Sequence, residues 1–310
     1  MTFAERVIAG DVSAVARALT RIERRSDGVN ELLAELHNRT HGAQVIGITG
    51  PPGSGKSTLT SRLTAEFRRR DRTVGVIAVD PSSAFTGGAI LGDRIRMSEL
   101  SGDPGVFVRS VATRGALGGL SRAVLDAITV LDAAGKDVIV LETVGVGQAE
   151  IDVLSAAGTV VVVSVPGMGD DVQASKAGLL EIADVHVVNK ADRDGAHRTA
   201  AELREIVRLT PHADGGWPTP IRQTVASTGD GVADLVDVLD EHRRWLDSSG
   251  ERVGRERNNA ATRIRWLVEE LVLHRLRPGN VDFDAAVDAV VARRTDPAAA
   301  ARELVRSLRP

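Results

Sequence analysis

The chain has 310 residues, 43% of them hydrophobic and 26% charged, and its 39 Lys and Arg nearly balance 42 Asp and Glu. This composition predicts a packed core, in one large α/β domain with helical additions or in two modest domains. The net charge of −3 favours neither nucleic acid nor an anionic membrane as a partner. The absence of cysteine excludes disulfides, Cys-ligated zinc, iron–sulfur clusters and a thiol nucleophile. No apolar run reaches the ~20 residues that span a bilayer, and residues 1–25 do not resemble a signal peptide, so we expect a cytoplasmic protein.

Residues 1–42 are predicted to form an N-terminal helical segment. Asp11 is placed to cap a helix in which Val15, Leu19 and Ile22 recur at helical spacing. Asn30 is expected to cap a second helix, with leucines facing inward after it.

Residues 43–247 are predicted to form a P-loop α/β domain. Short β-branched runs occur at residues 45–49, 74–79, 106–108, 138–141, 159–165 and 185–188. Most are almost continuously apolar, which is typical of strands buried on both faces of a parallel sheet. Helical patterns between them predict a doubly wound, mostly parallel sheet, in which ligands bind at the carboxyl ends of the strands.

Residues 248–310 are predicted to form a C-terminal helical extension. An apolar stripe at helical spacing includes Ile264, Leu267, Val268, Leu271 and Val272. Asp296 followed by Pro297 predicts the start of a further helix. This extension is too small to bury a good core alone, so it must pack on its own domain or on a second copy of the chain.

The clearest functional pattern is a phosphate-binding loop. Its sequence follows the pattern G-x-x-x-x-G-K-[ST] between an expected strand and an expected helix. The backbone N–H groups and the helix N-terminus would bind phosphates, Lys56 would reach the β- and γ-phosphates, and the Ser57 hydroxyl would bind Mg²⁺. The residues of this predicted cradle are Gly50, Pro51, Pro52, Gly53, Ser54, Gly55, Lys56, Ser57 and Thr58.

Three acidic residues are candidates for the magnesium site and for catalysis. Asp80 and Glu142 each close an expected strand, and Asp93 lies beyond the loop after Asp80. Mg²⁺ binds oxygen ligands and keeps several waters, so one or two carboxylates suffice beside the phosphates. Glu142 is followed at Gly145 by a glycine whose N–H is spaced to read the γ-phosphate.

The nucleotide base is expected to bind elsewhere along the same edge. Asn189, Lys190 and Asp192 follow a late apolar strand, and Asp192 can accept two hydrogen bonds from guanine. Adenine lacks that pair of donors, so this segment predicts GTP rather than ATP. Backbone N–H groups of Val225, Ala226 and Ser227 are candidates for binding the guanine O6.

Several longer runs resemble the MeaB/ArgK family of P-loop GTPases over nearly the whole chain. These runs are Asp80-Pro81-Ser82-Ser83, Gly92-Asp93-Arg94-Ile95-Arg96-Met97, Glu142-Thr143-Val144-Gly145-Val146-Gly147-Gln148 and Gly167-Met168-Gly169-Asp170-Asp171, with Lys176. The resemblance implies a homodimeric GTPase that binds an adenosylcobalamin-dependent acyl-CoA mutase, most often methylmalonyl-CoA mutase, and gates delivery and repair of its cofactor. It also implies that Asp80, Asp93 and Glu142 form the magnesium site. Asp170 and Lys176 match a mobile switch that responds to the partner.

One position departs from Ras-type GTPases. Val146 follows the switch glycine, where those proteins carry a water-orienting Gln, so slow intrinsic hydrolysis is expected. Three alternatives remain: an ATP-dependent kinase of the LAO/AO transport type, a metal-insertion GTPase and a non-hydrolysing scaffold. Asp192, the lack of Cys or His-rich metal motifs, and the intact Lys56 and Ser57 argue against them in turn.

Overall fold

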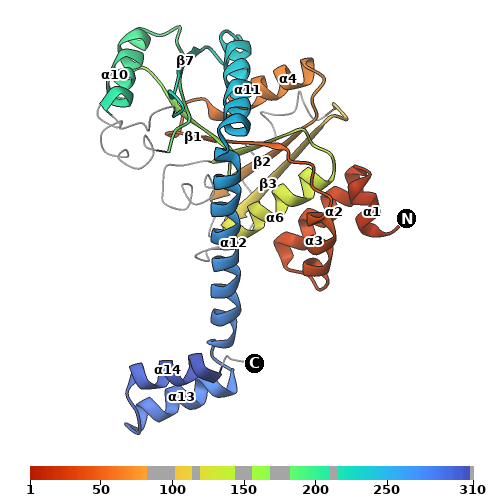
Figure 1. The fold of residues 1–310 in the computed structure, drawn as a ribbon, viewed down its shortest axis with the longest axis vertical. Coiled ribbons are helices and arrows are strands. Elements are labelled where there is room, and N and C mark those ends of the chain that lie inside the picture. Colours follow the sequence, from red (N-terminus) through yellow and green to blue (C-terminus); the bar gives the residue numbers. More distant parts are fainter. Residues whose placement is uncertain (82–101, 114–118, 144–155, 168–181, 210–215, 308–310) are drawn as a thin grey trace. The chain divides into compact units, whose positions relative to one another are not determined.

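The computed structural model describes residues 1–81, 102–113, 119–143, 156–167, 182–209 and 216–307 (Figure 1). The chain divides into two compact units, Met1–Arg255 and Glu256–Pro310. No helix among the described residues is both long enough and apolar enough to cross a membrane.

A seven-stranded sheet forms the centre of the first unit, in the order β3-β2-β4-β1-β5-β6-β7 (Figure 1). All six pairings between neighbouring strands are parallel, in agreement with the mostly parallel sheet that was predicted. The strands are β1 (Gln44–Thr49), β2 (Val74–Pro81), β3 (Val106–Thr113), β4 (Val138–Thr143), β5 (Thr159–Ser164), β6 (Val185–Asn189) and β7 (Ile221–Thr224). The central strands β4, β5 and β6 are buried along their whole length.

Helices cover both faces of this sheet, which confirms the doubly wound fold. On one face, α4 (Lys56–Arg69) and α11 (Val232–Ser249) enclose a core that includes Ile46, Val140 and Val187. On the other face, α6 (Gly119–Ala133) and the N-terminal helices pack on Ile139 and Leu141, while α10 (Ala196–Leu209) packs on Val188. Successive strand residues point to opposite faces, so both layers take apolar side chains from the same strands.

Three short helices precede the sheet: α1 (Phe3–Ile8), α2 (Val12–Arg24) and α3 (Val29–His37). Asp11 caps α2 as predicted, because its Oδ1 accepts a hydrogen bond from Ala14 N at 2.9 Å. The prediction that Asn30 caps the next helix is wrong. Gly28, at φ 77°, occupies the cap position of α3, and Asn30 Oδ1 accepts a hydrogen bond from Arg122 instead.

Strand β3 extends well beyond its predicted residues 106–108. It lies at the edge of the sheet, where polar side chains are tolerated, so its apolar run ends before the strand does. Arg109 lies in this extension, and its Nη2 bonds Glu23 of α2 at 2.7 Å.

The second unit consists of helices. Helix α12 (Glu251–Arg275) crosses the boundary between the units, and α13 (Val281–Val291) and α14 (Pro297–Ser307) pack against each other. Asp296 caps α14 as predicted, accepting hydrogen bonds from Ala298 N and Ala299 N at 2.9 and 3.0 Å. Neither α13 nor α14 buries a single residue. Leu271, in the predicted apolar stripe, is 69% exposed.

Candidate functional site

The predicted phosphate loop joins the carboxyl end of β1 to the start of α4. Two of its glycines are required by close packing. A Cβ at Gly50, which has φ 146°, would lie 2.2 Å from the carbonyl oxygen of Val163. A Cβ at Gly55, at φ 87°, would lie 2.5 Å from Asn189 Nδ2. The loop therefore needs glycine at both positions to lie against β5 and β6.

Lys56 places its ammonium group against the loop. Its Nζ donates hydrogen bonds to the carbonyl oxygens of Gly50 and Pro51 at 2.7 and 3.0 Å. The residue is only 6% exposed, so its positive charge is held inside the cradle rather than in bulk solvent. An ammonium group in this position suits the binding of phosphate oxygens by backbone N–H groups and a point charge together.

A hydroxyl and a carboxylate meet beside Lys56. Ser57 Oγ donates to Glu142 Oε1 at 2.5 Å, and Glu142 is 3% exposed at the end of β4. Strand pairing brings them together, because Ile48 of β1 lies opposite Glu142 in the parallel register. Both are hard oxygen donors of the kind that Mg²⁺ prefers, so this pair fits a magnesium site.

Of the other predicted acidic and switch residues, the structure describes only the backbone of Asp80. The backbone of Asp80 lies in β2, one residue before the strand ends and opposite Ala112 of β3. Its side chain is not among those described. Asp93, Gly145, Asp170 and Lys176 all lie outside the described residues, and their predicted roles stay predictions.

Asn189 connects the phosphate loop to the predicted base loop. It is 1% exposed at the end of β6, and its Nδ2 donates to the carbonyl oxygen of Ser54 at 2.8 Å. Its Oδ1 accepts hydrogen bonds from Thr224 Oγ1 and Ala226 N, both at 3.1 Å. The buried side-chain amide of Asn189 thus joins the end of β6 to the phosphate loop and to residues 224–226.

Lys190 and Asp192 continue from Asn189 along the same edge. Lys190, at φ 55°, donates from Nζ to the carbonyl oxygen of Gly53 at 2.6 Å. The hydrogen bond from Ala191 N to Thr224 O, at 3.0 Å, fixes the backbone between them. Asp192 is exposed, which leaves its carboxylate accessible to a ligand.

The three backbone N–H groups predicted to bind the guanine O6 are not equivalent. Val225 N donates to Asp230 O at 3.0 Å, and Ala226 N donates to Asn189 Oδ1. Both groups are therefore used within the protein. Of the three, Ser227 is the one whose N–H best suits contact with a base.

Comparisons with known proteins identify the family of the chain. Residues 15–280 match the family described as Methylmalonyl Co-A mutase-associated GTPase MeaB. The chain belongs to the MeaB family of GTPases. A protein of Pyrococcus horikoshii, provisionally named a GTPase, is 48% identical over 299 residues, covering 96% of this chain and 94% of the relative. The GTPase ArgK of Escherichia coli is 34% identical over 283 residues, covering 89% and 85%. A solved structure, named as an LAO/AO transport system kinase, has a TM-score of 0.74 at 25% identity and covers 99% of this chain and 97% of its own.

One residue that the sequence did not single out contacts the predicted base loop of this MeaB-family chain. Arg62 of α4 donates from Nε to Ala226 O at 3.2 Å and from Nη2 to Ser227 O at 2.9 Å. Its partners lie more than 160 residues away along the chain. No local pattern around Arg62 distinguishes it from a solvated arginine on a helix.

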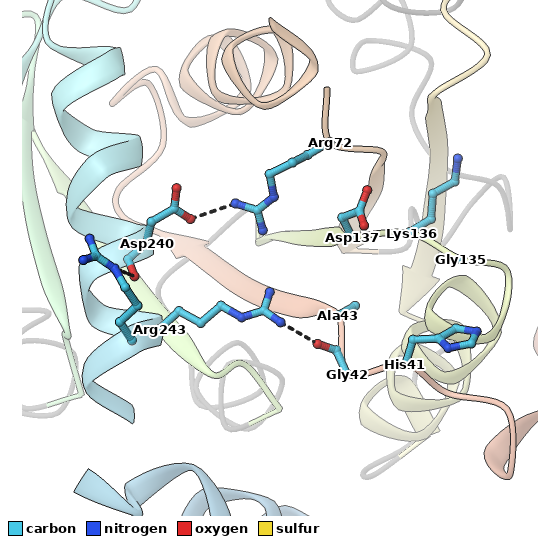
Figure 2. Close-up of a pocket in the computed structure, with 10 residues that line it drawn as sticks. His41, Gly42, Ala43, Arg72, Gly135, Lys136, Asp137, Asp240 and Arg243 are labelled. Atoms are coloured by element: carbon cyan, nitrogen blue, oxygen red, sulfur yellow. Dashed lines mark hydrogen bonds and ion pairs between the residues drawn. The ribbon is translucent and has the colours of Figure 1, made fainter. Parts of the chain in front are cut away.

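A cleft of about 530 Å³ lies at the amino ends of the strands, where β1, β2 and β4 begin (Figure 2). Charged side chains in it bond to groups of the protein itself. Arg72 Nη1 bonds Asp240 at 2.7 Å, and Arg243 Nη2 donates to Gly42 O at 3.0 Å (Figure 2). Because the phosphate loop follows the other end of β1, this cleft is not the nucleotide site.

Proposed function

We propose that this chain binds GTP with Mg²⁺, hydrolyses it, and couples the cycle to an adenosylcobalamin-dependent acyl-CoA mutase in the cytoplasm. The mutase we propose is methylmalonyl-CoA mutase, and the coupled step is delivery and repair of its cofactor. The family description, which names association with that mutase, supports the partner. The hydrogen bonds of Asn189 carry the nucleotide part of the proposal, because they join a phosphate loop to a base loop.

The chemistry would take place between Lys56, Ser57 and Glu142. Lys56 would exchange its carbonyl contacts for β- and γ-phosphate oxygens, and so hold the γ-phosphate in line for attack by water. Ser57 and Glu142 would hold Mg²⁺, with Asp80 and Asp93 as the further candidate ligands. When bound, Mg²⁺ would neutralise the charge that develops on the phosphate oxygens. Gly145 would sense the γ-phosphate through its N–H.

Nucleotide preference tests the proposal most directly. Calorimetry with Mg²⁺ should show GTP and GDP binding far more tightly than ATP. Asp192→Asn should erode this preference by about 1–3 kcal/mol, the cost of one mispaired polar group. Asp194→Asn is the matched control, since Asp194 is an exposed acid two residues further on. Equal affinity of the wild type for GTP and ATP would overturn the proposal.

A kinase is the second candidate, because one structural relative is named as an LAO/AO transport system kinase. The two functions differ in where the γ-phosphate goes. A GTPase releases inorganic phosphate in step with GDP in the absence of any acceptor. Nucleotide turnover that depends on an added acceptor, with no free phosphate released, would favour the kinase.

The partner is tested by adding the mutase encoded in the same genome. We expect it to accelerate phosphate release, because Val146 stands where Ras-type GTPases carry a water-orienting Gln and an apolar side chain cannot orient a water. Asp170→Ala and Lys176→Ala should blunt the acceleration if the segment that contains them responds to the partner. Unchanged release in the wild-type complex would refute activation. Full acceleration in both variants would refute only the role of that segment.

A homodimer completes the proposal, with the C-terminal helices as its interface. Support comes from the apolar residues that these helices leave exposed. Among them are Leu271, Val281 and Val291, whose exposed fractions are 69%, 81% and 76%. Apolar surface of this kind is rarely left in contact with solvent on a monomer. A second subunit would cover it.

A further inference from the structure

Two arginines, one in α4 and one at its C-cap, bind the segment that carries the base loop. Arg62 contacts the carbonyl oxygens of Ala226 and Ser227, and Arg70 contacts Ala233 O at 3.1 Å and Asp237 at 2.6 Å. Both arginines face the same neighbour, because their partners all lie within residues 226–237. The helix that begins at the phosphate loop therefore also holds the base loop and the first turn of α11.

The hydrogen bond to Ala226 O determines where a neighbouring donor points. The carbonyl of Ala226 and the N–H of Ser227 belong to one peptide group, and no described peptide bond is cis. In a trans peptide these two groups point in opposite directions. A carbonyl drawn toward Arg62 therefore directs the Ser227 N–H away from α4. The positive charge of the guanidinium also polarises the peptide group and makes that N–H a stronger donor.

The preceding peptide group is held independently. Ala226 N donates to Asn189 Oδ1, and Gly229 N closes the turn on Val225 O at 2.8 Å. The Ala226–Ser227 peptide is thus fixed at one end by the buried amide of Asn189 and on its carbonyl side by Arg62. Arg62 itself is exposed, so its loss leaves no buried cavity.

We propose that Arg62 is a positioning residue for guanine recognition, which aligns the Ser227 N–H with the O6 atom of the base. This inference rests on the proposed binding of GTP. It attributes the preference for guanine to two independent sets of hydrogen bonds. Asp192 reads the N1–H and the 2-amino group, and the peptide aligned by Arg62 reads O6.

The test compares Arg62→Ala with Arg69→Ala. Arg69 lies on the same helix and is exposed, but it pairs with Glu66 at 2.7 Å and not with the base loop. Displacement of a fluorescent GDP gives the affinity of each protein for GDP, for IDP, which lacks the 2-amino group, and for 6-thio-GDP, whose sulfur is a weak acceptor. Melting temperatures of the variants check that the fold is retained.

Arg62→Ala should weaken GDP and IDP equally, by about tenfold, the loss expected for one charge-assisted hydrogen bond. It should weaken 6-thio-GDP by less than threefold, and Arg69→Ala should leave all three affinities within twofold of the wild type. An equal loss for all three nucleotides would show a merely structural role and overturn the inference, as would unchanged GDP affinity. A wild type that binds ADP as well as GDP would instead overturn the proposed function.

Discussion

Replacing Arg255 by Ala should destabilise the first unit, because the buried carboxylate of Asp184 would lose its ion-pair partner. Arg255 Nη1 and Nη2 donate to the two carboxylate oxygens of Asp184 at 2.9 and 2.7 Å, and Nη1 also donates to Gly158 O. Asp184 Oδ2 accepts a further hydrogen bond from Val160 N at 2.8 Å. The paired carboxylate raises the pKa of Arg255 above its ordinary value. Removing the guanidinium leaves this carboxylate, only 9% exposed, without its counter-charge.

The expected loss follows from the burial of the two partners. Breaking a fully buried ion pair costs about 3–5 kcal/mol. The Arg255 side chain is 33% exposed, so water screens the pair and we expect about 2 kcal/mol. For a domain of this size, that loss lowers the melting temperature by about 4–8 °C.

Thermal unfolding at pH 7.5 and a fixed GDP concentration measures this effect, because bound nucleotide itself raises the melting temperature. Arg252→Ala is the matched control. Arg252 lies one turn earlier in α12 and bonds Asp247 at 2.7 Å, but both side chains are about half exposed. The control should change stability by less than about 0.5 kcal/mol. If Arg255→Ala melts within 1 °C of Arg252→Ala, the reasoning from burial is wrong.

Three further predictions follow. Lys56→Ala should abolish GTP hydrolysis and Glu142→Ala should reduce it at least tenfold without unfolding the protein; turnover within twofold of wild type would exclude these roles. Burial lowers the pKa of both His186 and His242 from 6.5 to about 4. Because the unfolded chain then binds protons that the folded chain does not, stability should fall between pH 6.5 and 4, by up to about 3 kcal/mol per histidine. Urea unfolding should show this, and His242→Gln should remove part of the loss. Leu271→Glu should convert the proposed dimer to a monomer in light scattering; a wild type that is already monomeric at micromolar concentration would contradict the interface.

The interior strands were predictable because each has an apolar run buried on both faces, whereas β7, a half-buried edge strand with the sequence IRQT, was not among the predicted strands. Where a strand lies at an edge, this signal fails, as in β3, whose polar half continues through Arg109. Helix caps were predictable where the side chain makes the cap, as at Asp11 and Asp296. At α3 the cap is the backbone of Gly28 in a left-handed conformation, so the nearby Asn30 was a misleading signal.

The candidate site likewise contains residues that local structure places and contacts that only the tertiary fold creates. The positions of Lys56, Ser57 and Glu142 in the fold were predictable because a loop or a strand end places each of them directly. The contacts between the loops were not, because they join residues far apart in sequence. Asn189 binds Ser54 across 135 positions, and Arg62 binds Ala226 across 164. Only the packing of α4 and β6 beside β7 and its following loop brings these groups together.

Asn189 shows why an amide is needed where these segments meet. Its Nδ2 must donate to a carbonyl oxygen of the phosphate loop while its Oδ1 accepts from the base loop. A carboxylate in its place would face the Ser54 carbonyl without a proton to donate, and an apolar side chain would leave three buried polar groups unpaired. The residue therefore binds the two loops to each other, while its predicted contact with the base stays a prediction. Two sets of contacts, those of this amide and those of Arg62 of α4, therefore tie the base loop to the phosphate loop and to the helix that follows it.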